Sequence, residues 1–222
     1  MTATESVTPV LIPPLDLVGD LQVPLKRRGI VIFAHGSGSS RLSPRNQRVA
    51  QSLADAGMAT LLFDLLTDDE ARDRTNVFDI DLLAKRLAQA IDWVRAQPTL
   101  AQLPIGLFGA STGAAAARKA AAARPQAVAA VVSRGGRPDL ARSALGRVTA
   151  PTLLIVGGRD EPVLTWNQQA LRMLAGPAHL EVVSGATHLF EEPGALEAVI
   201  KLAVAWFGDR LGSVADLSST AG

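Results

Sequence analysis

The chain has 222 residues, of which 48% are hydrophobic and 19% charged, and its 22 Lys and Arg nearly balance its 21 Asp and Glu. This composition predicts one globular domain over residues 1–222, and a net charge of +1 without a basic stripe argues against a nucleic-acid partner. The absence of cysteine excludes disulfides, cysteine metal sites and a cysteine nucleophile. Because no signal-peptide pattern and no apolar run of about 18 residues is present, we expect a cytoplasmic location and no contact with a membrane.

Apolar runs of strand length alternate with helical patterns along most of the chain. The first two runs are separated by Pro13-Pro14, and the second alternates apolar and polar residues like an exposed antiparallel edge strand. Most later runs are almost continuously apolar, which is typical of strands buried on both faces. The predicted strands cover residues 10–12, 15–23, 29–34, 59–64, 104–110, 128–133, 152–157 and 179–183, and the predicted helices cover about 44–56, 79–96, 112–124, 163–174 and 194–207.

This order of elements predicts an α/β fold, with a mostly parallel sheet of about eight strands and helices on both faces. We expect loose tails at residues 1–8 and 213–222, and we expect the acidic stretch at 67–70 to be solvated. No linker rich in Pro and Gly divides the chain into two cores. The sequence therefore predicts a single domain.

The strand predicted at 104–110 ends in the pattern G-x-S-x-G, and a helix rich in alanine follows at once. Strand, sharp turn and helix together are typical of a nucleophile elbow, which would place Ser111 at the tip of a strained turn. Gly109 and Gly113 lack a Cβ, so neighbouring backbone can approach the turn closely. The first N–H groups of the helix would then face a developing oxyanion.

Polar residues follow the carboxyl ends of the predicted parallel strands, which share one edge of the sheet. Ser111, Asp160 and His188 arrive there in the chain order of the α/β hydrolases. His188 would act as the base that activates the Ser111 hydroxyl, and Asp160 would orient the imidazole. Asp139, one strand earlier, is the alternative acid. We interpret His35 as a brace for the neighbouring loop or as a buried side chain rather than as a base.

Four stretches together resemble the dienelactone-hydrolase-like branch of the α/β-hydrolase superfamily over about residues 10–208. They are A-H-G-S-G-S-S at 34–40, G-A-S-T-G at 109–113, V-G-G-R-D at 156–160 and G-A-T-H at 185–188. The resemblance implies the α/β-hydrolase fold and the Ser111, Asp160 and His188 triad. It also implies an oxyanion hole made by the backbone N–H groups of Thr112 and of Ser37, with Gly36 as the alternative to Ser37.

Two further points follow from the resemblance. Dienelactone hydrolases proper use a cysteine nucleophile, so the serine here puts dienelactone itself in doubt as the substrate. Relatives of this type also occur fused to phosphoribosyltransferase domains, and we find no such segment in these 222 residues.

The segment from 134 to 151, where many hydrolases carry a cap, has room only for a turn and one short helix. We therefore expect no cap domain and a small ester or lactone substrate, cleaved through an acyl-enzyme without metal or other cofactor. Arg41, Arg45, Arg134 and Arg137 lie near the expected site. Of these, Arg41 and Arg134 have no obvious acidic partner nearby in sequence, and they are candidates for binding a negative group on the substrate.

Two other function classes are considered. A dinucleotide-dependent oxidoreductase is disfavoured because the loop after residue 34 has Arg41 where the third glycine of G-x-G-x-x-G would lie. The chain also has no tyrosine, so it cannot contain the Tyr-x-x-x-Lys of short-chain dehydrogenases. A non-catalytic binding protein of hydrolase fold is the second alternative, although such proteins usually lack a triad residue. The sequence leaves open the natural substrate and the oligomeric state.

Overall fold

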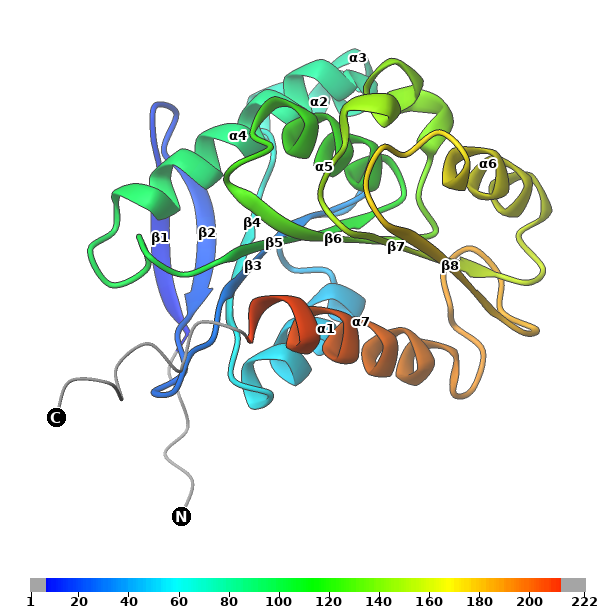
Figure 1. Ribbon diagram of the computed structural model, residues 1–222. Helices are drawn as coiled ribbons and strands as arrows, with labels where there is room; N and C mark the ends of the chain where they lie inside the picture. Colours follow the sequence, from blue (N-terminus) through cyan, green and yellow to red (C-terminus); the bar gives the residue numbers. More distant parts are fainter. Residues whose placement is uncertain (1–6, 213–222) are drawn as a thin grey trace, which may run out of the picture.

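The structure, a computed structural model, describes residues 7–212, and its strands form one eight-stranded sheet in the order β1-β2-β4-β3-β5-β6-β7-β8 (Figure 1). The strands are β1 (Thr8–Ile12), β2 (Leu17–Gln22), β3 (Ile30–Ala34), β4 (Ala59–Phe63), β5 (Ile105–Ala110), β6 (Val128–Arg134), β7 (Thr152–Gly157) and β8 (Ala178–Val183). β1 and β2 pair antiparallel, as do β2 and β4, while the remaining neighbours are parallel. The expected mostly parallel sheet with an antiparallel edge pair is confirmed.

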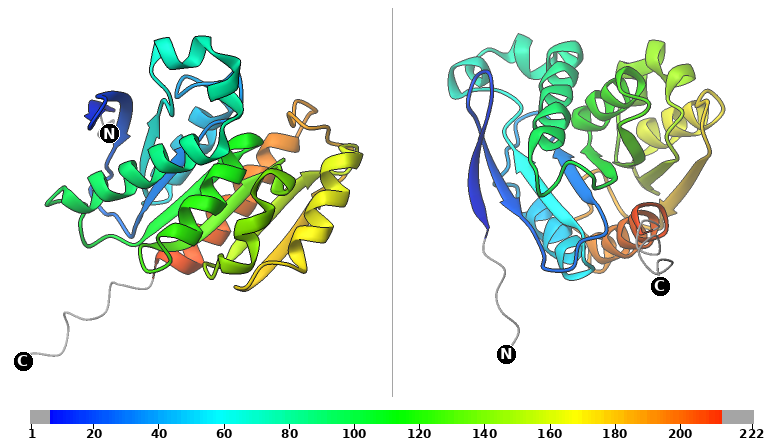
Figure 2. Two further views of the ribbon diagram at one scale, coloured as in Figure 1. Left: turned by 90° about the horizontal axis from the view of Figure 1, so that it is seen from above. Right: turned by 60° about the vertical axis from the view of Figure 1, so that its left-hand side comes forward.

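Helices cover both faces of this sheet (Figures 1 and 2). They are α1 (Pro44–Asp55), α2 (Asp68–Arg72), α3 (Arg74–Phe78), α4 (Ile80–Ala96), α5 (Thr112–Ala123), the 3-10 helix η1 (Pro138–Arg147), α6 (Glu161–Leu171) and α7 (Ala195–Leu211). α1 and α7 lie side by side on one face, and α4, α5, η1 and α6 lie on the other. Between β6 and β7 the chain contains only η1, so no cap domain covers the sheet.

The side chains of the central strands point alternately to the two faces of the sheet, and they divide the core into two layers. In β3, Ile30 and Ile32 pack with α4 and α5, whereas Val31 and Phe33 pack with α1 and α7. Successive side chains of a strand point to opposite faces, so both faces of β3 must be apolar to be buried. This double burial explains why the strand reads as a continuous apolar run in the sequence.

Several predicted boundaries need correction. The loose tail expected at 1–8 overlaps β1, because Thr8 pairs with Leu21 in the antiparallel ladder. The solvated stretch at 67–70 begins α2, a short helix that was not predicted, where the Thr67 hydroxyl accepts from the Glu70 N–H and the Glu70 carboxylate accepts from the Thr67 N–H. This reciprocal pattern is a capping box, and its T-x-x-E signature was readable in the sequence. The predicted tail at 213–222 lies outside the described residues.

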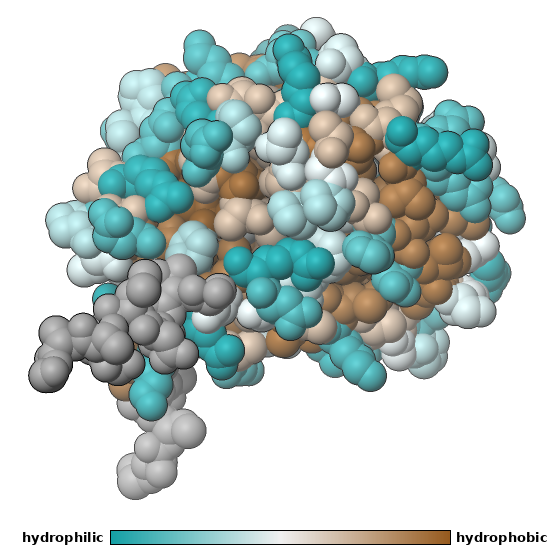
Figure 3. Space-filling model, in the orientation of Figure 1, coloured by the Kyte–Doolittle hydropathy of each residue, from teal (hydrophilic) through white to brown (hydrophobic). Residues whose placement is uncertain are grey.

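One of the two edge strands of the sheet is β8, whose side chains are exposed or half-buried. Val182 in this strand is exposed, and Figure 3 shows hydrophobic residues gathered on that side of the molecule. Across residues 7–212, no helix combines the length and apolar character needed to cross a membrane. We propose that these residues form one domain, because every strand described belongs to the same sheet.

Candidate active site

Ser111 lies in the sharp turn between β5 and α5, with φ 52° and ψ −118°. A positive φ at a residue with a side chain costs about 1–3 kcal/mol, and the surrounding structure must hold it in place. The Ser111 N–H donates to the Arg134 carbonyl at 3.1 Å, and the Ser111 carbonyl accepts from the Arg137 N–H at 3.2 Å. A Cβ on Gly113 would overlap the backbone carbonyl oxygens of Ala34 and His35. The turn therefore needs glycine there for the steric reason inferred from the sequence.

His188 links Ser111 to Asp160. Its Nδ1 lies 2.6 Å from Asp160 Oδ2, and its Nε2 lies 3.2 Å from Ser111 Oγ. An ionised carboxylate only accepts hydrogen bonds, so Nδ1 carries the proton in the neutral imidazole and Nε2 accepts from the Ser111 hydroxyl. The three side chains, from the turns after β5, β7 and β8, thus form one directed hydrogen-bonded chain.

The alternative acid, Asp139, is engaged elsewhere. Both of its carboxylate oxygens accept from the Arg137 guanidinium, at 2.9 and 2.7 Å. That guanidinium also stacks over the Trp166 ring, 4.6 Å from its centroid. Of the two aspartates considered from the sequence, the structure brings only Asp160 into contact with His188.

The loop after β3 lies against the start of α5. The Ser37 N–H donates to Thr112 Oγ1 at 2.8 Å, and a Cβ on Gly36 would be 3.2 Å from Ser111 Cβ. Thr112 is the first residue of α5, where a helix leaves its N–H groups without intrahelical acceptors. The backbone groups expected to form the oxyanion hole are therefore adjacent, with the Ser37 N–H held by the Thr112 side chain.

His35 braces this loop, as expected. Its Nε2 accepts from the Leu65 N–H at 3.1 Å, so Nδ1 carries the proton and donates to the Gly36 carbonyl at 3.0 Å. Burial lowers the pKa of His35 and favours this neutral form. With both ring nitrogens occupied by backbone groups, His35 is not available as a base for Ser111.

The expectation that Arg41 is an unpaired cation is wrong. Its guanidinium pairs with the carboxylates of Asp20 and Asp64, and its N–H donates to Asp64 Oδ1 at 2.7 Å. These partners lie on β2 and after β4, so local sequence could not reveal them. Arg41 lines a second cavity of about 380 Å³, on the side of the 36–42 loop that faces Leu66 and Val77.

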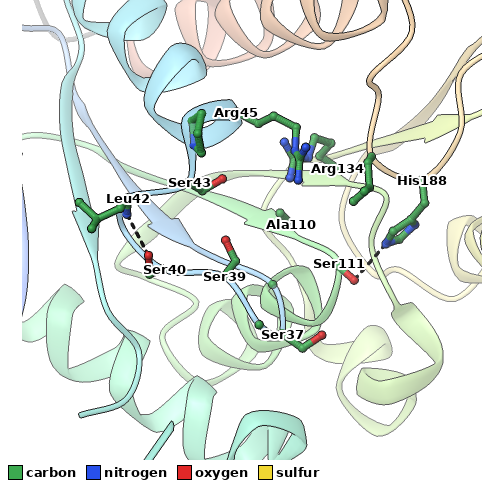
Figure 4. Close-up of a pocket in the computed structure, with 14 residues that line it drawn as sticks. Ser37, Ser39, Ser40, Leu42, Ser43, Arg45, Ala110, Ser111, Arg134 and His188 are labelled. Atoms are coloured by element: carbon green, nitrogen blue, oxygen red, sulfur yellow. Dashed lines mark hydrogen bonds between the residues drawn. The ribbon is translucent and has the colours of Figure 1, made fainter. Parts of the chain in front are cut away.

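Arg134, in contrast, lines the cavity that contains Ser111 and His188. This cavity has a volume of about 560 Å³, and its wall includes Arg45 and the serines of the loop that follows β3 (Figure 4). Arg134 is only 7% exposed, and its Nη1 has no hydrogen-bond partner in the described part of the chain. Burial, with a smaller contribution from the neighbouring Arg45, lowers the pKa of Arg134 to about 10, so the side chain is still charged at pH 7.

Comparison with known proteins agrees with this geometry. Residues 27–201 match the family model described as an alpha/beta hydrolase domain. The chain belongs to the alpha/beta hydrolase family. A dienelactone hydrolase from Anabaena variabilis is 55% identical with a TM-score of 0.89, and the match covers 93% of this chain and 98% of that one. The dienelactone-hydrolase-like branch and the fold are thereby confirmed.

Two further comparisons identify other proteins that are similar to this alpha/beta hydrolase. Proteins from two strains of Mycobacterium tuberculosis, provisionally named phosphoribosyl transferases, are 62% identical over 202 residues. The match covers 91% of this chain and 46% of each relative, so the chain spans about half the length of these relatives. A serine hydrolase homologue from Coxiella burnetii shares the fold at 22% identity, with a TM-score of 0.75 and coverage of 92% and 98% of the two chains.

The burial of one arginine near the site of this hydrolase could not be predicted from the sequence. Arg118 of α5 is fully buried and donates to Ser133 Oγ at 2.7 Å, beneath the loop that carries Gly136. Burial lowers the pKa of Arg118 to about 10, and Asp139 partly opposes this effect. In sequence Arg118 stands among alanines, and only the packing of α5 against β6 places it under the site.

Proposed function

We propose that this protein is a serine hydrolase that cleaves a small ester or lactone through an acyl-enzyme intermediate. The observation that carries the proposal is the hydrogen-bonded chain from Asp160 through His188 to Ser111. Membership of the alpha/beta hydrolase family supports a hydrolytic reaction. The choice of ester or lactone rests on the likeness to a dienelactone hydrolase, whose name describes a lactone substrate.

In the proposed acylation step, His188 Nε2 accepts the proton of the Ser111 hydroxyl as Oγ attacks the substrate carbonyl carbon. The proton then passes from Nε2 to the leaving oxygen, and the bond between that oxygen and the carbonyl carbon breaks. Asp160 stabilises the imidazolium that exists between these events, without itself taking up the proton. Water then attacks the acyl-enzyme with the same base, which releases the acid and restores Ser111.

The negative oxygen of the tetrahedral intermediate would be bound by the Thr112 N–H and by an N–H of the loop after β3. Ser37 is our candidate for the second donor, with Gly36 as the alternative. Because the Ser37 N–H donates to Thr112 Oγ1 in this structure, it would exchange that acceptor for the oxyanion. The Thr112 hydroxyl keeps this donor beside the site, so the direction of the Ser37 N–H bond is what has to change when the oxyanion forms.

The cavity around Ser111 supports a small substrate. With no cap between β6 and β7, its walls are mainly glycine, serine and arginine, and the apolar lining residues are Leu42, Pro44, Ala110 and Leu189. A long acyl chain would find little apolar surface there. The small number of apolar residues in this wall favours a compact, polar substrate.

The direct test is incubation with a fluorophosphonate, followed by mass spectrometry of peptides that contain Ser111. We expect a covalent adduct on Ser111, no adduct in Ser111→Ala, and strongly reduced labelling in His188→Ala. A screen of short p-nitrophenyl esters and lactones would then define the substrate. An unlabelled wild-type protein would contradict the proposal and favour the non-catalytic binding protein instead.

A further inference from the structure

Arg134 is a buried cation that the proposed chemistry does not use. It ends β6 beside the elbow, where its backbone carbonyl accepts from the Ser111 N–H at 3.1 Å. Its side chain is 7% exposed, and no acidic residue in the described part of the chain pairs with it. Burying a charge without a partner is unfavourable, so such a group is expected to have an anionic partner in the working protein.

A second guanidinium lies beside it. Arg45, in the first turn of α1, is close enough to Arg134 to lower the pKa of that residue further. Figure 4 shows the two side chains side by side, in the same wall as Ser39 and Ser43. Arg45 pairs with the exposed Glu191 at 2.9 Å, and its buried Nε has no partner among the described residues. Two cations thus share one side of the cavity, and among the described residues the carboxylate of Glu191 pairs with Arg45 but not with Arg134.

The surroundings add neutral donors and a favourable dipole. The hydroxyls of Ser39 and Ser43 line the same cavity as Ser111. α1 is 12 residues long and begins at this wall, so the positive end of its dipole lies there. Arg45, Arg134, hydroxyl groups and a helix N-terminus together form an environment suited to an anion with several oxygens.

We propose that Arg134 and Arg45 bind a phosphate group carried by the substrate at a position away from the ester or lactone bond. This inference rests on the proposed function for the identity of the reacting group. A phosphate monoester carries close to two negative charges at pH 7, and its tetrahedral oxygens suit two guanidiniums that approach from different elements. A carboxylate carries one charge in a single plane and would leave the second cation less well neutralised.

Turnover of three matched esters tests the proposal. They are methylumbelliferyl butanoates whose acyl chain ends in phosphate, in carboxylate or in an uncharged methyl ether. We expect kcat/KM for the phosphate ester to exceed that of the uncharged ester by about tenfold or more, which is the effect of one or two charged hydrogen bonds. Arg134→Met and Arg45→Ala should remove this preference, so that the ratio of kcat/KM for the phosphate ester to kcat/KM for the uncharged ester falls to about one.

The matched control is Arg48→Ala. Arg48 lies one turn further along α1 and pairs with Glu197 as Arg45 pairs with Glu191, but it is absent from the Ser111 cavity. This variant should keep the full preference for phosphate. If Arg134→Met does not fold, as judged by circular dichroism, the result for Arg45→Ala decides whether the phosphate site exists. Arg45 is the more exposed of the two arginines, so its replacement should disturb folding less.

Calorimetry separates this inference from the proposed function. Inorganic phosphate should bind to Ser111→Ala at least about tenfold more tightly than acetate at equal ionic strength, and Arg45→Ala should lose that binding. Phosphate binding without fluorophosphonate labelling would contradict the hydrolase and leave the anion site standing. Labelling of Ser111 with no phosphate binding, or equal rates on phosphate and carboxylate esters, would overturn the phosphate site.

Discussion

The Ser37 N–H donates a hydrogen bond to Thr112 Oγ1, 2.8 Å away, although 75 positions separate the two residues in the chain. The bond joins the loop after β3 to the first residue of α5, and it therefore connects the two segments that would supply the oxyanion hole. A loop of glycines and serines has little packing of its own to fix its conformation. We infer that the Thr112 hydroxyl positions the second oxyanion donor.

Thr112→Val keeps the shape of the side chain but removes the acceptor for Ser37. We expect kcat for a short ester to fall by about tenfold with little change in KM, because a displaced donor affects the intermediate more than the bound substrate. Thr112→Ser retains the hydroxyl and should stay close to wild type. Steady-state kinetics on both variants measure this difference. A rise in kcat for Thr112→Val would show instead that the hydroxyl competes with the oxyanion for the Ser37 N–H.

Substitutions in the Ser111, His188 and Asp160 chain should have unequal effects. Ser111→Ala or His188→Ala should lower kcat/KM for ester hydrolysis by at least about 10³-fold, because nucleophile and base act as a unit. Asp160→Asn should lower it by at least about 10²-fold, since it can no longer select the required tautomer. Asp139→Asn breaks the pair with Arg137 and leaves the hydrogen bond from His188 to Asp160 in place, so it is the control. A damaging Asp139→Asn with a silent Asp160→Asn would reverse our assignment of the acid.

His35 should make the fold less stable in mild acid. Burial lowers the pKa of His35, so the unfolded chain takes up a proton near pH 6.5 while the folded protein does so only at lower pH. Between these two pH values the unfolded state binds more protons, and the free energy of unfolding therefore falls as the pH drops below about 6.5. The contribution is at most about 1.4 kcal/mol per pH unit.

Denaturant unfolding of wild type and His35→Gln at pH 7.5 and 5.5 tests this effect. Glutamine can still donate to the Gly36 carbonyl but does not titrate, so the variant should lose less stability between the two pH values. The comparison cancels the contributions of the other titrating groups. Equal losses in both proteins would mean that His35 is protonated as readily in the folded state as in the unfolded one.

The rate of ester hydrolysis should be highest for short acyl chains. A methylene that is truly buried contributes about 0.8 kcal/mol, but the Ser111 cavity offers few apolar side chains beyond Leu42 and Leu189. We therefore expect kcat/KM on p-nitrophenyl esters to stop rising before acyl chains of about eight carbons. A continued rise through C12 would indicate that the apolar cavity near Leu66 and Val77 opens to the substrate.

Local sequence was sufficient to predict those features that depend on neighbouring residues. Continuous apolar runs predicted the buried strands, because a strand covered on both faces cannot alternate. The glycines around Ser111 predicted the elbow, since the steric demand acts within a few residues of the turn. The placement of Ser111, Asp160 and His188 at one edge of the sheet followed from the parallel arrangement of their strands.

Tertiary structure decided which charged side chains remain without partners. From the sequence, Arg41 and Arg134 had the same status, since neither had a nearby acid. Folding brings Asp20 and Asp64 to Arg41, from β2 and the end of β4, whereas within residues 7–212 the charged neighbour of Arg134 is the like charge of Arg45. Ion pairs form over a few ångströms in space between residues from distant parts of the chain, so sheet order and helix packing, rather than local sequence, determine where an anion can bind.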